Sequence, residues 1–279
     1  MSEYYYGKPE NTGSWEQTAS IFAAHESLNS EKTSSLPLVQ FWKWVNKSLP
    51  ENIQKFASRC NIPEEEMTNS KLYFEYPVSV QPTEDGVGRG KASMTDLMIL
   101  TNNYAIAVEA KWTECKNLNY GDKCDTWLKN GKQDYDANRI KVLNGWLSCI
   151  NSHCSAKPSS AKLTIDSVKD TPYQLIHRIS SACVAAKSEN GIHAKTPLVV
   201  YHLFHDAEIT DKTNKFASNL KEWFEELSIA NIQFAVLKTE IKEGFPICVA
   251  EEELNELFIK MQKESLYTFG ETLLSYIFI

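Results

Sequence analysis

The sequence predicts an α/β fold in which a mixed central sheet is flanked by helices. After residue 71, strand-like apolar runs alternate with helix-like patterns, which is typical of helices packed on both faces of a sheet. The 279 residues are 42% hydrophobic and 23% charged, which is enough apolar material for a substantial core. We expect a single domain with a helical N-terminal region over 1–70, a core over 71–112 and 171–279, and an insertion over 113–170.

The N-terminal region contains two signals for helices. Ser14 is followed three residues later by Gln17, which forms a capping box at the start of a helical pattern. A second helix is expected from Leu38 to about Lys47. The run from Leu72 to Val80 is rich in aromatic and β-branched residues and predicts a strand, and the glycines within 86–90 mark a mobile loop after it.

Two apolar runs, Asp96 to Leu100 and Tyr104 to Val108, predict a β-hairpin. Asn102 and Asn103 lie between them, and asparagine tolerates the positive φ that a tight two-residue turn requires. Both faces of the two runs are apolar, so we expect the hairpin to be covered on both sides. It is therefore predicted to be central in the sheet.

The hairpin register brings charged side chains to one end. With the two asparagines as the turn, Asp96 lies opposite Glu109, and opposed Cβ atoms are about 5 Å apart. Lys111 falls on the same face, one step further along the strand. Facing carboxylates repel each other, and a hard divalent cation such as Mg²⁺ resolves that conflict. A neighbouring lysine can then orient or deprotonate a metal-activated water.

Thr95-Asp96, twelve intervening residues and Glu109-Ala110-Lys111 resemble the signature of the PD-(D/E)XK nuclease superfamily, also called restriction-endonuclease-like. Thr95 replaces the proline of the family name, as in many members. The resemblance implies a restriction-endonuclease-like core in which Asp96, Glu109 and the Ala110 carbonyl bind Mg²⁺ or Mn²⁺ and Lys111 positions the water. It also implies DNA as the substrate, an endonuclease of restriction or defence type rather than an exonuclease, and a product that keeps its phosphate on the 5′ side.

Three alternatives stay open beside this interpretation. Two further acid-X-lysine runs exist, Glu114-Cys115-Lys116 and Glu240-Ile241-Lys242, but the first has no strand behind it and the second has acidic partners only in a predicted helix. The charged hairpin end is also explained by a solvated surface. Finally, a non-catalytic module could retain the nuclease fold in order to bind nucleic acid or a partner protein.

A helix is predicted after Pro172, with a buried apolar stripe between Leu175 and Ala186. Gln174, His177 and Arg178 lie on the opposite, polar side of the helical wheel. The resemblance implies a helix beside the catalytic strands that supplies such groups, so these three residues are candidate supporting residues. An ordinary exposed face is the alternative interpretation.

Three other charged residues are candidates on less support. Some members of the family add a glutamate from the first helix, and Glu26 is that position here, although a solvent-facing glutamate is the simpler explanation. Arg89 and Lys91 precede Asp96 in the glycine-rich segment. They are candidate nucleic-acid-binding residues that would contact phosphates, or else they are ordinary surface charges.

The rest of the chain continues the alternation of helices and strands. Inside the insertion, one helix is expected from Asn138 to Ile150. The core then continues with a strand from Pro197 to Phe204, a helix over 215–227, a strand from Ile232 to Leu237 and a helix over 251–262.

Composition limits the partners and the compartment. The net charge of −7 argues against a polyanion in general, but residues 113–170 hold nine basic and seven acidic residues, so the insertion is a candidate DNA grip. The negative net charge is also compatible with a homodimer. No apolar run approaches the roughly 20 residues of a membrane helix, so no membrane partner is expected.

The seven cysteines predict reduced thiols in the cytoplasm, because the chain has no signal-peptide pattern at its start. Four of them lie within the insertion near His153, namely Cys115, Cys124, Cys149 and Cys154. Their spacing departs from the short loops of common zinc motifs, so structural zinc is not expected.

Overall fold

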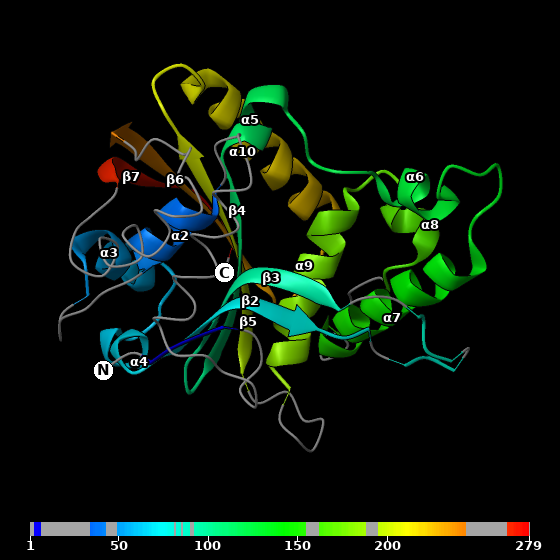
Figure 1. Ribbon diagram of the computed structural model, residues 1–279. Helices are drawn as coiled ribbons and strands as arrows, with labels where there is room; N and C mark the ends of the chain where they lie inside the picture. Colours follow the sequence, from blue (N-terminus) through cyan, green and yellow to red (C-terminus); the bar gives the residue numbers. More distant parts are fainter. Residues whose placement is uncertain are drawn as a thin grey trace, which may run out of the picture.

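The computed structural model describes residues 3–6, 34–42, 49–80, 82–84, 86–89, 92–154, 162–187, 195–243 and 267–278. Within these ranges, seven strands form one open mixed sheet in the order β1 to β7, and helices cover both of its faces (Figure 1). The predicted α/β class is confirmed. The strands are β1 (Glu3–Tyr6), β2 (Lys71–Val78), β3 (Ser93–Leu100), β4 (Tyr104–Lys111), β5 (Thr196–His205), β6 (Gln233–Glu243) and β7 (Thr268–Phe278). The helices are α2 (Ser35–Trp42), α3 (Glu51–Arg59), α4 (Glu64–Thr68), α5 (Thr113–Asn117), α6 (Cys124–Lys129), α7 (Ala137–Cys154), α8 (Ile165–Val168), α9 (Tyr173–Ala185) and α10 (Thr210–Glu226).

Strand direction changes across the sheet. β1 runs parallel to β2, and β2, β3 and β4 are antiparallel neighbours. β4, β5 and β6 are parallel, and β7 returns antiparallel to β6. The predicted strands at β2, β5 and β6 are confirmed. β5 is slightly longer than expected and β6 continues to Glu243, whereas β2 ends at Val78, before the expected Val80.

Two strands were not predicted. β1 lies inside the N-terminal region expected to be helical, so that expectation is wrong for Glu3–Tyr6. This run is too short to show a helical period, and its three tyrosines favour a strand once β2 is there to pair with. β7 was missed for a related reason. Its residues are only partly buried, and the strand is stabilised by its pairing with β6, which is distant in sequence.

The central hairpin has the predicted register. Leu97 pairs with Val108 and Leu100 with Ala105, and β2 and β5 flank the two strands. The turn differs from the expectation, because neither Asn102 nor Asn103 has a positive φ. Side chains hold it instead, and the main one is Glu66 of α4. Its carboxylate accepts hydrogen bonds from the Thr101 hydroxyl at 2.6 Å and the Asn103 backbone N–H at 3.0 Å.

Helices α9 and α10 cover one face of the sheet, and α2 and α3 cover the other (Figure 1). On the α2 face, the Trp42 indole N–H donates to His202 Nδ1 of β5 at 3.1 Å. On the other face, Phe224 of α10 stacks on Phe234 of β6 with ring centroids 4.3 Å apart. α9 packs against β3, β4 and β5 together, which places this helix over the charged end of the hairpin.

The predicted apolar stripe of α9 is confirmed, since Leu175, Ile176, Ile179, Ala182, Cys183 and Ala186 are all fully buried. The insertion helix predicted from Asn138 to Ile150 is confirmed as the central part of α7, which packs against α9. The short helices α5, α6 and α8 were not predicted, because four to six residues show no helical period.

Some of the remaining predictions concern residues that the structure describes only in part or not at all. The second predicted helix begins earlier than expected, as α2 at Ser35, and is described to Trp42. The first helix after Ser14 and the helix over 251–262 lie outside the described residues. Among the residues that are described, no helix is long and apolar enough to cross a bilayer. The six cysteines in these ranges are buried free thiols.

A candidate active site at the end of the central hairpin

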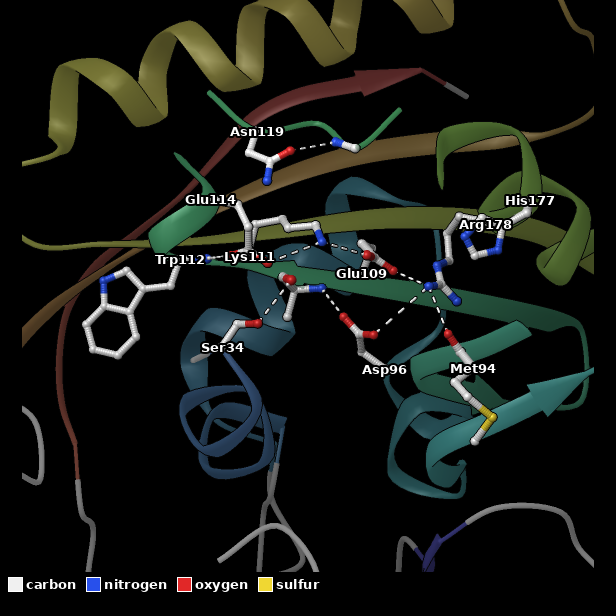
Figure 2. Close-up of polar contacts among 12 residues, drawn as sticks. Ser34, Met94, Asp96, Glu109, Lys111, Trp112, Glu114, Asn119, His177 and Arg178 are labelled. Carbon is white, nitrogen blue, oxygen red and sulfur yellow. Dashed lines mark hydrogen bonds and ion pairs between the residues drawn. The ribbon is translucent and has the colours of Figure 1, made fainter. Parts of the chain in front are cut away.

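The regular pairing of β3 with β4 ends at Leu97 and Val108, and Asp96 lies one residue beyond it. Asp96 Oδ2 accepts the backbone N–H of Ala110 at 2.8 Å, so its side chain continues the contact between the strands (Figure 2). Its other oxygen, Oδ1, is 4.0 Å from the Arg178 guanidinium. The predicted approach of Asp96 to the Glu109-Ala110-Lys111 segment is therefore present in the structure.

Glu109 is buried, with 3% of its surface exposed, and two cations hold it. Lys111 Nζ lies 3.0 Å from Glu109 Oε1, and Arg178 Nη2 donates to Oε2 (Figure 2). Lys111 also contacts Glu114 Oε1 at 3.4 Å. Glu114, which belongs to the rival acid-X-lysine run, thus joins the same cluster as a partner of the lysine.

Arg178 corrects the expected polar face of α9. It is 2% exposed and points toward the sheet, where its Nη2 also donates to the Met94 carbonyl at 3.0 Å. A buried guanidinium is tolerated here because it is paired with the buried Glu109 carboxylate. Its Nε and Nη1 atoms have no hydrogen-bond partner among the described residues.

The other two α9 candidates have different surroundings. His177 Nδ1 is 2.5 Å from the Ser93 hydroxyl, and its ring stacks on Tyr173 with centroids 5.2 Å apart. Burial, with a smaller effect of Arg178, lowers the pKa of His177 to about 3, so its ring is neutral at pH 7. Gln174 packs against Gly121 in the connection after α5 and is not brought to the carboxylates.

Glu75 of β2 is a further residue of this cluster that sequence reasoning missed. The pairs Phe74–Leu97 and Tyr76–Thr95 flank it, which places Glu75 across from Asp96 in the register. Its φ of +51° is unusual for a residue with a side chain. Burial raises the pKa of Glu75, and nearby Glu109 adds to this against the opposing effect of Arg178. The available signal was a single acidic residue inside an aromatic strand.

The two central carboxylates differ in charge. Burial and the negative charge of Glu109 raise the pKa of Asp96 to about 7, against the opposing effects of Arg178 and Lys111. Burial also disfavours the ionised form of Glu109, but Arg178 and Lys111 outweigh it and lower the pKa of Glu109 to about 2. At neutral pH, Glu109 is therefore ionised and Asp96 is near the midpoint of its titration.

Lys111 is protonated in this setting. Burial disfavours its ammonium, but the carboxylates of Glu109, Glu114 and Asp96 outweigh burial and raise the pKa of Lys111. A lysine with a raised pKa donates hydrogen bonds and cannot serve as a general base near neutral pH. Of the two roles expected for Lys111, its raised pKa favours orienting a water over deprotonating it.

The donor set matches the preferences of a hard divalent cation. Asp96, Glu109 and Glu75 supply carboxylate oxygens beside the two cations Lys111 and Arg178. Carboxylate oxygens are the ligands that Mg²⁺ prefers. The Ala110 carbonyl accepts the Ser34 hydroxyl at 3.1 Å, so that oxygen already has a partner. Within the described ranges, no three His, Cys, Asp or Glu side chains form a ready-made metal site.

The remaining candidates lie apart from this cluster or outside the described residues. Arg89 is exposed in the loop before β3, while Lys91 and Glu26 fall outside the described ranges. The thiols of Cys115 and Cys124 are buried, and burial raises the pKa of each to about 12.

The protein is thus of the α/β class, with a mixed sheet and a cluster of carboxylates and a lysine at the end of its central hairpin. The chain belongs to the family described as Domain of unknown function (DUF6946), whose profile matches residues 11–251. No curated protein and no solved structure matches it.

Proposed function

We propose that this protein is a metal-dependent deoxyribonuclease of the PD-(D/E)XK type that hydrolyses phosphodiester bonds, with an endonuclease favoured over an exonuclease. One observation carries the proposal: Asp96, Glu109 and Lys111 converge at the end of a central hairpin in the register that the nuclease signature requires. The order of hairpin, helix α9 and parallel strand β5 further supports a restriction-endonuclease-like core.

Asp96 and Glu109 would hold Mg²⁺ or Mn²⁺, with the Ala110 carbonyl as a third oxygen if Ser34 releases it. Such an ion supplies an activated water and stabilises charge on the phosphate. The protein's own groups add to this chemistry. Protonated Lys111 donates a hydrogen bond that orients the nucleophilic water, and it offsets charge that develops on the phosphoryl oxygens.

Arg178 acts on the position of Glu109. Its guanidinium links α9 to the carboxylate and to the Met94 carbonyl, so it fixes the direction in which Glu109 points. Because Arg178 and Lys111 approach different oxygens of Glu109, the carboxylate cannot rotate freely. This is the preorganisation that a hydrolytic site needs.

A second candidate function is a non-catalytic module that keeps this fold and binds nucleic acid or a partner protein. The observation that favours it is that both oxygens of Glu109 already pair with cations, so the cluster has a structural role of its own. A homodimer and a cytoplasmic location are parts of the proposal under either function, and DNA is the substrate of the nuclease.

Supercoiled plasmid tests the proposal. Wild type is incubated with the plasmid with and without Mg²⁺ or Mn²⁺, beside Glu109→Gln and Lys111→Met. Matched controls are Glu65→Gln and Lys116→Met, which change exposed residues. We expect metal-dependent cleavage that falls at least about a hundredfold in both site variants and is unchanged in both controls. If wild type and variants leave the plasmid intact yet bind it equally, the non-catalytic function is favoured.

A further inference from the structure

A cavity of about 330 Å³ lies beside the hairpin, between the start of β3 and helices α6, α7 and α9. Four aromatic rings form much of its wall, those of Trp127, Trp146, Tyr173 and His177. Arg89 and Arg139 supply the charge, and no Asp or Glu is among the described residues that line it. The cavity is thus apolar inside and positively charged, a combination suited to a flat ligand that carries an anion.

The aromatic wall is rigid. Trp127 and Tyr173 stack with centroids 3.8 Å apart and planes 7° apart, and His177 also stacks on Tyr173. The Trp146 indole N–H donates to the Tyr173 hydroxyl at 3.0 Å. Arg139 covers Trp127, with its Cζ 4.9 Å from the ring centroid. Because the rings and Arg139 contact one another, the wall needs little ordering when a ligand binds.

Arg89 is held at the cavity by its backbone, which leaves its side chain exposed. The Asn138 side chain of α7 accepts from the Arg89 N–H at 2.7 Å and donates to its carbonyl at 2.6 Å. The neighbouring Gly88 packs so closely that a Cβ there would lie 2.7 Å from the Val142 backbone nitrogen. The insertion thus fixes the loop that carries Arg89.

The cavity adjoins the candidate active site. Met94 lines it and lies two residues before Asp96, about 7 Å along a strand. The Met94 carbonyl also accepts a hydrogen bond from Arg178. His177, which precedes Arg178 in α9, lines the cavity. A ligand in the cavity would therefore sit next to whatever the carboxylates bind.

We propose that this cavity receives one unpaired nucleobase of a DNA strand, beside the phosphate that the site cleaves; this inference rests on the proposed function. Its volume is near the lower end of the roughly 300–1,000 Å³ of small-ligand pockets, so it holds a single base and excludes a base pair. A base must leave the duplex stack to enter such a pocket. The apolar walls receive the base, and the exposed Arg89 at the rim supplies positive charge for its phosphate.

Binding without metal tests the inference separately from cleavage. Three labelled duplexes are titrated in EDTA and followed by fluorescence anisotropy: one fully paired, one with a single bulged nucleotide, and one with a bulged abasic nucleotide. We expect the bulged nucleotide to bind about tenfold more tightly than either of the others, because base contacts with aromatic sites are worth that much. Equal affinity for the bulged nucleotide and its abasic counterpart would overturn the proposal.

Variants locate the effect. Trp127→Leu should remove the preference for the base, and Arg89→Gln should weaken binding of all three duplexes by several-fold. Arg59→Gln is the matched control, since Arg59 is an exposed arginine on α3, away from the cavity. Loss of preference in the control as well would contradict the assignment. If the bulged nucleotide is preferred but Mg²⁺ brings no cleavage, the nucleobase site is supported and the nuclease proposal is contradicted. If DNA is cleaved but the bulged nucleotide is not preferred, the nuclease proposal is supported and the nucleobase site is contradicted.

Discussion

Arg178 of α9 donates through Nη2 to Glu109 of β4, and both side chains are almost completely buried. This contact joins the helix that covers the sheet to the strand that carries the candidate site. It also sets the charge of Glu109, because the guanidinium beside it helps to keep the pKa of that carboxylate low. Stability and function of the site are therefore linked through one ion pair.

Removing Arg178 should destabilise the protein strongly. Arg178→Met leaves a buried, negatively charged Glu109 with only Lys111 beside it, and breaking such a pair costs about 3–5 kcal/mol. Urea denaturation measures the loss. Arg59→Met should change the free energy of unfolding by less than about 0.5 kcal/mol. Adding Glu109→Gln to Arg178→Met should restore part of the stability; a double variant that is additive would contradict this account.

Cation binding should depend on pH through Asp96. In the metal-free protein the pKa of Asp96 is raised to about 7, so below that pH a proton competes with the cation. We expect the affinity for Mg²⁺, measured by calorimetry, to fall as pH drops from 8 to 6, by up to about tenfold per unit below the pKa. Asp96→Asn should bind Mg²⁺ weakly at every pH. An affinity that does not change over this range would exclude Asp96 as a titrating ligand.

His202 should make the protein sensitive to acid. Its Nδ1 accepts from Trp42, so Nε2 carries the proton and donates to Thr239 at 2.8 Å. Burial lowers the pKa of His202 to about 3, below the unfolded value of 6.5. The unfolded chain therefore binds the proton first, and stability falls as pH drops from 6.5 toward 3, by up to about 1.4 kcal/mol per unit. Thermal denaturation of His202→Gln should show a shallower slope in that window, while His205→Gln, at a partly exposed position, should keep the wild-type slope.

Glu66 should stabilise the hairpin turn. Its carboxylate accepts from Thr101 and from the backbone of Asn103, so Glu66→Ala removes charge-assisted hydrogen bonds at a turn without positive φ. We expect a loss of about 1–3 kcal/mol in urea denaturation. The adjacent Glu65→Ala changes an exposed side chain and should be neutral. Equal effects of the two variants would show that the contacts of Glu66 contribute nothing.

Glu75 should lower the stability of the fold while its carboxylate contributes to Mg²⁺ binding. Its φ of +51° is a conformation that glycine adopts without strain, and its carboxylate is disfavoured by burial. Glu75→Gly should therefore raise the free energy of unfolding by about 1 kcal/mol while it weakens Mg²⁺ binding. Glu75→Gln separates the two effects, because it removes the charge and keeps the backbone strain. A Gly variant less stable than the Gln variant would contradict the strain argument.

Much of the fold follows from local patterns. Two apolar runs separated by two asparagines predicted the hairpin, and its pairing at Leu97 and Val108 followed from the length of the turn. The apolar stripe of α9 followed from the helical period. Asp96, Glu109 and Lys111 were predictable as a group for the same reason, since they lie within one hairpin whose register is a local property.

The sequence by itself therefore determined the strands β2 to β6, the main helices and the three hairpin residues, because local patterns decide them. Only the tertiary structure decided that Arg178 turns inward to Glu109, that Glu75 lies across from Asp96, and that β1 joins the sheet. Each depends on which distant element supplies a partner, and a buried charge or a short strand is stable only when that partner is present. The cavity beside the site belongs to this second group, since its wall combines β3, α6, α7 and α9.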